Sequence, residues 1–261
     1  MAMRNLERIF RPRRVALCGV CGKGSDLGAN VLRNLLSGGF QGVVYPVHPE
    51  CEAVHGIATY PDLAGLPRVP DLAVVCNPAP EVPEVVRRCG EAGIPGVVVL
   101  SGGFRESNDE GRRLEEELAR IAAGFDGMRV LGPNSLGVLH PSMGLNASHA
   151  VTMPKAGHLA FVSESRALCN SVMDWAAEEG IGFSTFVSTG NRVDMSFGDL
   201  IDYFGNDPET RAIILYVQSI KNARRFMSAA RAFALTKPIV AYKAGRFEAS
   251  AQAVASHTGS M

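Results

Sequence analysis

The sequence is poor in aromatic residues, has no excess of either charge and contains no long apolar run. Aromatic residues make up 7% of its 261 positions, and Lys+Arg and Asp+Glu each number 26. A chain with zero net charge lacks the broad basic surface that nucleic acid or an anionic membrane attracts, so neither is expected as a partner. No run approaches the roughly 20 apolar residues that span a bilayer, and residues 1–14 are too basic for a signal peptide.

The cysteines follow no disulfide framework. They are Cys18, Cys21, Cys51, Cys76, Cys89 and Cys169. Several lie inside apolar runs, where cysteine packs as a small hydrophobic residue. This usage is typical of a reducing compartment and predicts a cytoplasmic protein. Cys18 and Cys21 have CxxC spacing, but no second such pair and no His pair follows, so no metal site is expected.

Short apolar runs alternate with helical patterns along the whole chain. Strands are expected at residues 15–20, 43–48, 71–76, 96–100, 128–131, 159–162, 183–188, 212–217 and 239–243. Helices are expected at residues 27–36, 82–89, 110–122, 167–178, 197–204 and 223–234. Continuous apolar strands suit a sheet that crossover helices bury on both faces. The alternation therefore predicts the α/β class, with doubly wound parallel sheets.

The rhythm breaks around residues 141–157, which are rich in proline and glycine. We therefore expect two tandem α/β domains, residues 1–141 and residues 154–261. A hydrophobic fraction of 46% is enough for a sizeable core. The second domain has only about four expected strands, which predicts that it is truncated at its C-terminus.

Loops that follow the strands of an open α/β sheet are where ligands bind. The loop at residues 19–28 is glycine-rich and leads into a helix, a combination that brings backbone N–H groups to a phosphate. It is either part of a nucleotide-like site or a plain tight turn. Its candidate ligand residues are Gly19, Cys21, Gly22, Lys23, Gly24 and Ser25. The loops after the next four strands add His48, Asn77, Pro78, Ser101, Gly102, Asn134 and Ser135.

Together these loops outline one crevice suited to an extended ligand with phosphates at one end. A dinucleotide-binding protein tends to place an acidic residue at the end of the second strand for a ribose diol. His48 occupies that region, so NAD binding and an oxidoreductase activity are only weakly supported.

The second domain repeats the theme with small hydroxyl residues at expected helix starts. Such residues cap a helix or hold a phosphate, and capping alone is the commoner explanation. The candidate phosphate-binding residues are Ser163, Ser165, Arg166, Thr189, Gly190 and Asn191.

His257 lies among small residues in the segment Ser-His-Thr-Gly-Ser at the end of the sequence. Neutral imidazole is a nucleophile near neutral pH, so a histidine on an open small-residue loop is able to accept a phosphoryl group and pass it on. The alternative is an ordinary surface histidine. Two helix starts facing such a loop would stabilise a phosphorylated imidazole.

Several of these segments resemble one family as a set. They are residues 39–47, the Gly-Pro-Asn-Ser-Leu-Gly of residues 132–137, the Ser-Thr-Gly-Asn of residues 188–191 and the Ser-His-Thr-Gly of residues 256–259. The chain resembles the α-subunit part of the NDP-forming acyl-CoA synthetases, such as ADP-forming acetate–CoA ligase and, more distantly, succinyl-CoA synthetase. The resemblance extends from Leu6 to Met261.

The resemblance implies a Rossmann-like coenzyme A-binding domain followed by a flavodoxin-like ligase domain. It implies that His257 is a transient phosphohistidine, and that acyl-CoA forms from a carboxylic acid, coenzyme A and ATP through this phosphohistidine and an acyl phosphate. ATP or ADP with Mg²⁺ would bind only in an ATP-grasp part, either a β subunit or a C-terminal extension. Without that part the chain is expected to be inactive, and a homo-oligomer is possible.

The chain departs from the family pattern at positions that matter. The family pattern Ser-Gln-Ser-Gly is replaced by Ser163-Glu164-Ser165-Arg166, which puts an acid beside the expected phosphate site. The family glutamate that supports the phosphohistidine is replaced by Gln218, which accepts a hydrogen bond but adds no charge. Two functions therefore stand: an acid–CoA ligase that uses His257 and Gln218, or a degenerate CoA- or acyl-CoA-sensing module of a larger protein, such as a protein acetyltransferase.

Overall fold

The chain folds around two sheets, and the computed structural model describes residues 5–21 and 27–245. The predicted sites at Gly22, Lys23, Gly24, Ser25 and His257 lie outside the described residues. The first sheet is parallel, with the strand order β2-β1-β5-β6-β7. Its strands are β1 (Arg14–Cys18), β2 (Val43–Val47), β5 (Leu72–Val75), β6 (Gly96–Val99) and β7 (Arg129–Leu131).

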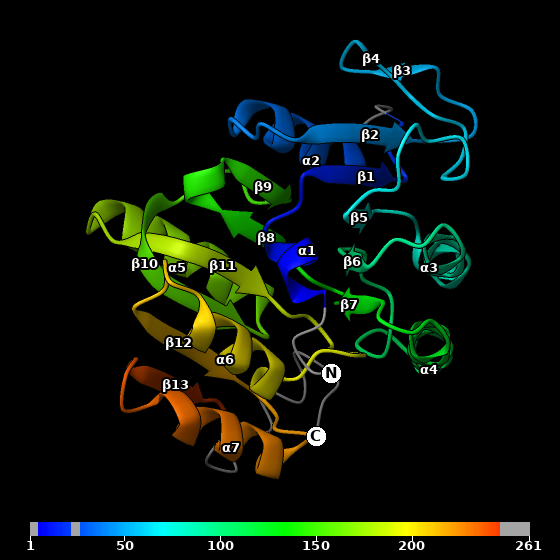
Figure 1. Cartoon of the computed structure of the whole chain (residues 1–261). Coiled ribbons are helices and arrows are strands. Elements are labelled where there is room, and N and C mark those ends of the chain that lie inside the picture. The colour runs from blue at the N-terminus through cyan, green and yellow to red at the C-terminus, as the bar shows by residue number, and fades with distance from the viewer. Residues whose placement is uncertain (1–4, 22–26, 246–261) are drawn as a thin grey trace.

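Helices cover both faces of this sheet. One face packs against α1 (Leu6–Phe10) and α2 (Leu27–Ser37). The other packs against α3 (Val82–Glu91) and α4 (Asp109–Gly124), which Figure 1 shows side by side. Small elements complete the domain: the β3 (Ala53–Val54) and β4 (Ile57–Ala58) hairpin and the short helix η1 (Ala79–Glu81).

The second sheet has six strands, in the order β13-β12-β10-β11-β8-β9. They are β8 (Gly137–His140), β9 (Leu145–Ser148), β10 (Lys155–Ser163), β11 (Gly182–Ser188), β12 (Ala212–Val217) and β13 (Ile239–Lys243). The last four are parallel, and β8 runs antiparallel to both β11 and β9. The α/β class and the two predicted domain types are confirmed. Every strand and helix expected from the apolar alternation is present within a few residues of its expected bounds.

Strands β8 and β9 were not predicted, and they correct the expected strand count. The second sheet has six strands rather than about four, and its first strand begins at Gly137. Each of the two strands has only four residues, and His140, Asn146 and Ser148 are buried polar positions within them. No continuous apolar run marks them, and the short helix η2 (Pro141–Met143) joins them.

The two sheets share a hydrophobic core. Helix α5 (Arg166–Glu178) covers one face of the second sheet, while α6 (Phe197–Asn206) and α7 (Ala223–Phe233) lie on the other. The α6 face packs against the α1 side of the first sheet: the ring of Phe10 lies 4.8 Å from that of Tyr203 and 5.2 Å from that of Phe204, measured between centroids. Helix α2 also contacts β9, as Figure 1 shows. Across the described part of the chain, no helix has the length and hydropathy needed to cross a bilayer.

Candidate functional site

The loops that leave the carboxyl ends of β1, β5 and β6 meet in one place. Gly19 has φ +79°, and a Cβ atom there would lie 2.7 Å from both the backbone nitrogen and the Oδ1 of Asn77. The hydroxyl of Ser101 donates to the carbonyl oxygen of Asn77 at 2.5 Å. Only glycine allows this close approach of the first loop to the third. The structure thus brings together three residues predicted to bind coenzyme A.

The loop after β7 extends this row. The backbone nitrogen of Asn134 donates to the carbonyl oxygen of Ser101 at 2.8 Å, and a Cβ atom on Gly102 would lie 3.2 Å from Asn134 Oδ1. Ser135 is different, since it is fully buried and its hydroxyl donates to the carbonyl oxygen of Ser188 at 2.5 Å. Ser135 therefore joins the first domain to β11, whereas Pro78 is exposed at the rim.

Two amide oxygens in this row are buried and have no hydrogen-bond partner among the described residues: Asn77 Oδ1 and Asn134 Oδ1. A buried acceptor without a partner is costly, so it points to a ligand or an ordered water at that place. The pantetheine arm of coenzyme A carries amide N–H groups that suit such acceptors. The residues present therefore fit coenzyme A.

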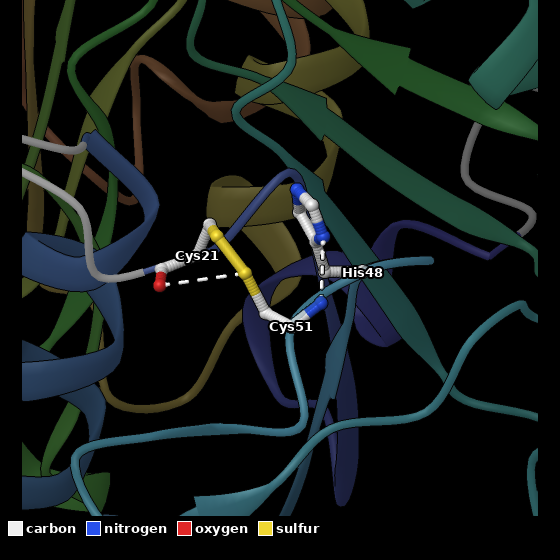
Figure 2. Close-up of side chains that lie close together, drawn as sticks. All are labelled: Cys21, His48 and Cys51. Carbon is white, nitrogen blue, oxygen red and sulfur yellow. Dashed lines mark hydrogen bonds between the residues drawn. A yellow bond between two sulfur atoms is a disulfide. The ribbon is translucent and has the colours of Figure 1, made fainter.

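Cys21 and His48, also predicted to bind coenzyme A, form a second group with Cys51. Cys21 and Cys51 are disulfide-bonded with their Cα atoms 5.6 Å apart, as Figure 2 shows. A ligand atom of His48 lies within 4.8 Å of both sulfur atoms. This pairing was not predicted, because the cysteines are 30 residues apart and only the strand register of β1 and β2 brings them together. The other four cysteines are buried and form no disulfide, so the interpretation of cysteine as a packing residue holds for them.

The loop after β10 is engaged in capping, the commoner of its two predicted roles. The hydroxyl of Ser165 accepts from the backbone nitrogen of Leu168 at 3.2 Å and caps α5. The hydroxyl of Ser163 accepts from the backbone nitrogen of Ser165 at 3.0 Å. Arg166 is exposed at the first position of the helix. Among these predicted phosphate ligands, the Arg166 side chain is the most open to solvent.

The loop after β11 lies in the seam between the two domains. The Nδ2 atom of Asn191 donates to Glu106 and Glu115, both at 2.7 Å. Gly190 has φ +56° and lies directly against the carbonyl oxygen of Pro133, so a side chain there would collide with backbone. Thr189 is fully buried. Helix α6 does not start at this loop but at Ser196, where a capping box with Asp199 closes its end. The second phosphate-binding helix start expected after β11 is therefore not at these residues.

Glu164, the unexpected acid, is not free. Its Oε1 atom lies 2.6 Å from Nη2 of Arg192, and both side chains are at most 4% exposed. Its Oε2 atom accepts from the backbone nitrogen of Ser219 at 3.1 Å and from that of Gln218. A paired and fully hydrogen-bonded carboxylate exerts little repulsion on a neighbouring anion. Glu164 instead fixes the backbone that carries Gln218, a contact that the sequence did not indicate.

The seam holds further charged residues with altered pKa values. Burial raises the pKa of Glu115, although Arg105 and Asn191 oppose the change. Burial also acts to raise the pKa of Glu106, but hydrogen bonds from Asn191 and from backbone N–H groups outweigh it, and the pKa is lowered. Burial lowers the pKa of Lys221, assisted by Arg105 and Arg192. Glu106, Glu115 and Lys221 were not predicted, since isolated charges in loops and helices carry no distinctive sequence signal.

A cavity of about 540 Å³ lies beside this cluster. Its lining residues are Asp126, Gly127, Arg129, Arg192, Val193, Asp194, Met195, Ser196, Asp199, Lys221, Asn222 and Arg225. No residue predicted to bind coenzyme A or phosphate is among them. Most of the charged side chains in this lining already have a partner. For example, Nη2 of Arg225 lies 2.7 Å from Oδ1 of Asp199. The cavity is therefore a polar cleft next to the seam rather than the predicted crevice.

The two domains match two known families. Residues 13–141 match the family described as a CoA binding domain, and residues 156–261 match the succinyl-CoA ligase like flavodoxin domain. The fold and the two matches together define an α/β protein made of a CoA binding domain and a succinyl-CoA ligase like flavodoxin domain. The chain belongs to the NDP-forming acyl-CoA synthetases, in the part that corresponds to their α subunits.

Individual relatives support this placement. The chain is 40% identical to the α subunit of acetate–CoA ligase [ADP-forming] II of Pyrococcus furiosus, over 98% of this chain and 55% of that protein. It is 33% identical to 4-hydroxybutyrate–CoA ligase [ADP-forming] of Nitrosopumilus maritimus, over 97% of this chain and 36% of that protein. The solved acetyl-coenzyme A synthetase 1 of Ca. Korarchaeum cryptofilum, in complex with phosphate and ADP, superposes with a TM-score of 0.92 at 42% identity, over 98% of this chain and 55% of that one. The chain thus spans about half or less of the length of these relatives.

Proposed function

We propose that this chain is the coenzyme A-binding and phosphoryl-carrying part of an NDP-forming acid–CoA ligase. The overall reaction converts a carboxylic acid, coenzyme A and ATP into acyl-CoA, ADP and phosphate. The observation that carries the proposal is the match of both domains, in this order, to α subunits of ADP-forming ligases. The row of Gly19, Asn77, Ser101 and Asn134 supports coenzyme A binding at the carboxyl edge of the first sheet.

In this proposal His257 accepts the γ-phosphoryl group of ATP, which leaves as ADP, and passes it to the carboxylate of the acid to form an acyl phosphate. The thiol of coenzyme A then attacks the acyl carbon and phosphate leaves. Gln218 accepts a hydrogen bond from the other ring nitrogen and so orients the imidazole. The contacts from Glu164 to the backbone of residues 218 and 219 support that role, because they hold the segment in place. Helix α5, capped by Ser165 and begun by Arg166, offers the positive end of its dipole to a phosphate.

ATP or ADP and its Mg²⁺ are assigned to an ATP-grasp part, in a partner subunit or in an extension of the chain. The lengths of the relatives, of which this chain covers 36–55%, support a further part. Relatives at comparable identity act on acids as different as acetate and 4-hydroxybutyrate, so the class of acid is left at a carboxylic acid.

The ligase is tested by labelling. With its ATP-grasp part present, the protein is expected to take up acid-labile, base-stable label from γ-labelled ATP, and His257→Ala should abolish that label. His158→Ala is the matched control, since His158 is exposed on β10 and its Nδ1 contacts only the carbonyl oxygen of Glu209. Label that persists in the His257 variant contradicts the assignment.

The substitution of glutamine for the family glutamate at residue 218 keeps a second function in view: a coenzyme A- or acyl-CoA-sensing module of a larger protein. Calorimetry separates the two. A protein that binds coenzyme A in a 1:1 ratio, yet takes up no label with its ATP-grasp part present, is a sensor rather than a ligase. Absence of coenzyme A binding contradicts both.

A further inference from the structure

The Cys21–Cys51 pair differs from every other cysteine of the chain in its exposure. Both residues are partly exposed, whereas Cys18, Cys76, Cys89 and Cys169 are buried thiols. Burial raises the pKa of Cys169 to about 12, and the pKa of Cys89 is also raised, by Cys18 beside it and by burial. Buried cysteines are inert, and the raised pKa values of Cys89 and Cys169 further disfavour the reactive thiolate at those two. Thiol chemistry in the described part of the chain is therefore confined to one pair.

The fold sets the spacing of this pair without help from the sulfur atoms. Strands β1 and β2 are adjacent and in register, with Cys18 opposite Val47. The backbone nitrogen of Gly19 donates to the carbonyl oxygen of Val47 at 3.3 Å, and that of His48 donates to the carbonyl oxygen of Tyr60 at 2.9 Å. Both cysteines follow within a few residues of these contacts. Their Cα separation of 5.6 Å lies within the range that a disulfide needs.

The same arrangement suits the reduced state. The Sγ atom of Cys51 lies 3.5 Å from the carbonyl oxygen of Cys21 (Figure 2), a position from which the S–H group of the reduced cysteine would donate a weak hydrogen bond. The carbonyl oxygen of Cys51 accepts from the hydroxyl of Thr59, which holds this segment against the β3–β4 hairpin. Since neither state requires the backbone to move far, the two states interconvert at small conformational cost.

Two thiols and a histidine could instead bind a metal ion, which is the alternative to redox chemistry at this place. The Nδ1 atom of His48 accepts from the backbone nitrogens of Glu50 at 3.1 Å and Cys51 at 3.2 Å. Its lone pair is thus occupied, and in the neutral ring the proton lies on Nε2, so neither nitrogen is free to bind a metal. This hydrogen bonding favours sulfur redox chemistry over metal binding.

We propose that Cys21 and Cys51 are a reversible dithiol–disulfide couple that exchanges with low-molecular-weight disulfides. The thiolate of one cysteine attacks the disulfide RSSR, forms a mixed disulfide and releases one RS⁻. The second cysteine attacks the protein sulfur of that mixed disulfide, closes the Cys21–Cys51 bond and releases the second RS⁻. The two protein thiols lose two electrons and two protons, RSSR gains the electrons, and solvent carries the protons.

The couple lies within the predicted coenzyme A site, which gives its redox state a consequence. Cys21 and His48 belong to the predicted site, and the disulfide fixes the segment after β1 to the segment after β2. Oxidation removes the freedom of both segments to adjust around the ligand, so it lowers the affinity for coenzyme A, by about tenfold on the scale of typical coupling between sites. This second step rests on the proposed function, whereas the couple itself does not.

The test equilibrates the full 261-residue chain in glutathione buffers of graded ratio, followed by acid quenching, alkylation under denaturing conditions and peptide mass mapping. Cys21 and Cys51 are expected to lose alkylation together as the buffer becomes oxidising, while the peptide of Cys169 stays alkylated as the internal control. In Cys51→Ser no intramolecular bond forms, and Cys21 is alkylated or carries glutathione. Alkylation of both cysteines across the whole range overturns the couple. So does stoichiometric zinc that protects both thiols in the reduced chain.

Calorimetry with coenzyme A on the oxidised and reduced chain tests the second step. We expect about tenfold weaker binding to the oxidised form, and no redox dependence in Cys51→Ser. Equal or tighter binding to the oxidised form overturns the coupling and leaves the couple standing. If neither form binds coenzyme A while the thiols still titrate, the proposed function fails and the couple does not.

Discussion

Glu164 and Arg192 form an ion pair at 2.6 Å that is almost completely removed from solvent. Arg192 has a left-handed backbone, with φ +57°, and its guanidinium also donates to the carbonyl oxygen of Ser219 at 2.8 Å and lies over the ring of Phe197. The pair therefore ties together the loops after β10, β11 and β12. The acid that looked damaging in the sequence has its own cation beside it.

Glu164→Gln is expected to destabilise the protein by about 3 kcal/mol, because it leaves the Arg192 guanidinium buried without its counter-charge. The amide N–H₂ group would also face either the donors of Arg192 or the backbone N–H groups of residues 218 and 219. Urea denaturation measures the loss. Glu178→Gln, on the exposed side of α5, is the matched control and should change stability by less than about 0.5 kcal/mol. Equal effects of the two changes would contradict the assigned role of the pair.

Asn191→Ala is expected to cost about 2–3 kcal/mol, since the carboxylates of Glu106, which is half-buried, and Glu115, which is buried, each lose the hydrogen bond that the Asn191 amide donates. Asn191→Asp tests the charge. At pH 8 it should be more destabilising than the alanine variant, because a third carboxylate joins two others, and the difference should shrink as the pH falls toward 4.5. Denaturation at several pH values measures both variants. A difference that does not depend on pH would show that shape, not charge, decides this position.

Gly190→Ala is expected to cost about 2 kcal/mol or more, from a left-handed backbone and from contact of the new Cβ atom with the Pro133 carbonyl. Gly39→Ala separates the two causes. Gly39 also has positive φ, +82°, but a Cβ atom there meets nothing within 4 Å. Gly39→Ala should lower the free energy of unfolding by only about 1 kcal/mol, which is the cost of the left-handed backbone alone. Thermal denaturation compares them, and equal losses would mean that the close approach at the seam is readily relieved.

The buried His140 should make stability depend on pH. Burial, and then the charge of Arg11, lower its pKa below the ordinary 6.5. Below pH 6.5 the unfolded chain then binds a proton that the folded chain does not, so this contribution to stability is present above pH 6.5 and is lost as the pH falls toward the folded pKa. His140→Gln should flatten the slope of unfolding free energy between pH 7 and pH 5. His158→Gln, at an exposed position, is the matched control.

Sequence periodicity predicted the fold well because the parallel strands are buried on both faces. The run Leu72–Val75 is fully buried, and such an apolar run is recognisable in the sequence without knowledge of the strands that pair with it. Strands β8 and β9 escaped because they are short and carry buried polar residues such as Asn146. Strand β8 pairs with β11, which comes later in the chain, and β9 pairs with β8, so nothing local marks either strand.

The residues of the candidate site show the same difference between local and long-range features. Asn77, Ser101 and Asn134 were found because each directly follows a strand that the sequence reveals. The contacts of Arg192 and Asn191 were missed because they join segments 28 and 76 residues apart. The Cys21–Cys51 pair was missed for the same reason, since it depends on two parallel strands lying in register.

The hydrophobic core that joins the two sheets has a consequence for how the protein is divided in the laboratory. Val15 of β1, Val138 of β8 and Leu200 of α6 belong to one buried cluster. A cut at residue 141 would expose the apolar side of each half to solvent and separate β8 from its pairing partner β11. The limits of the two matched families therefore do not coincide with separate cores, and we expect the two domains to unfold together and neither half to be stable alone.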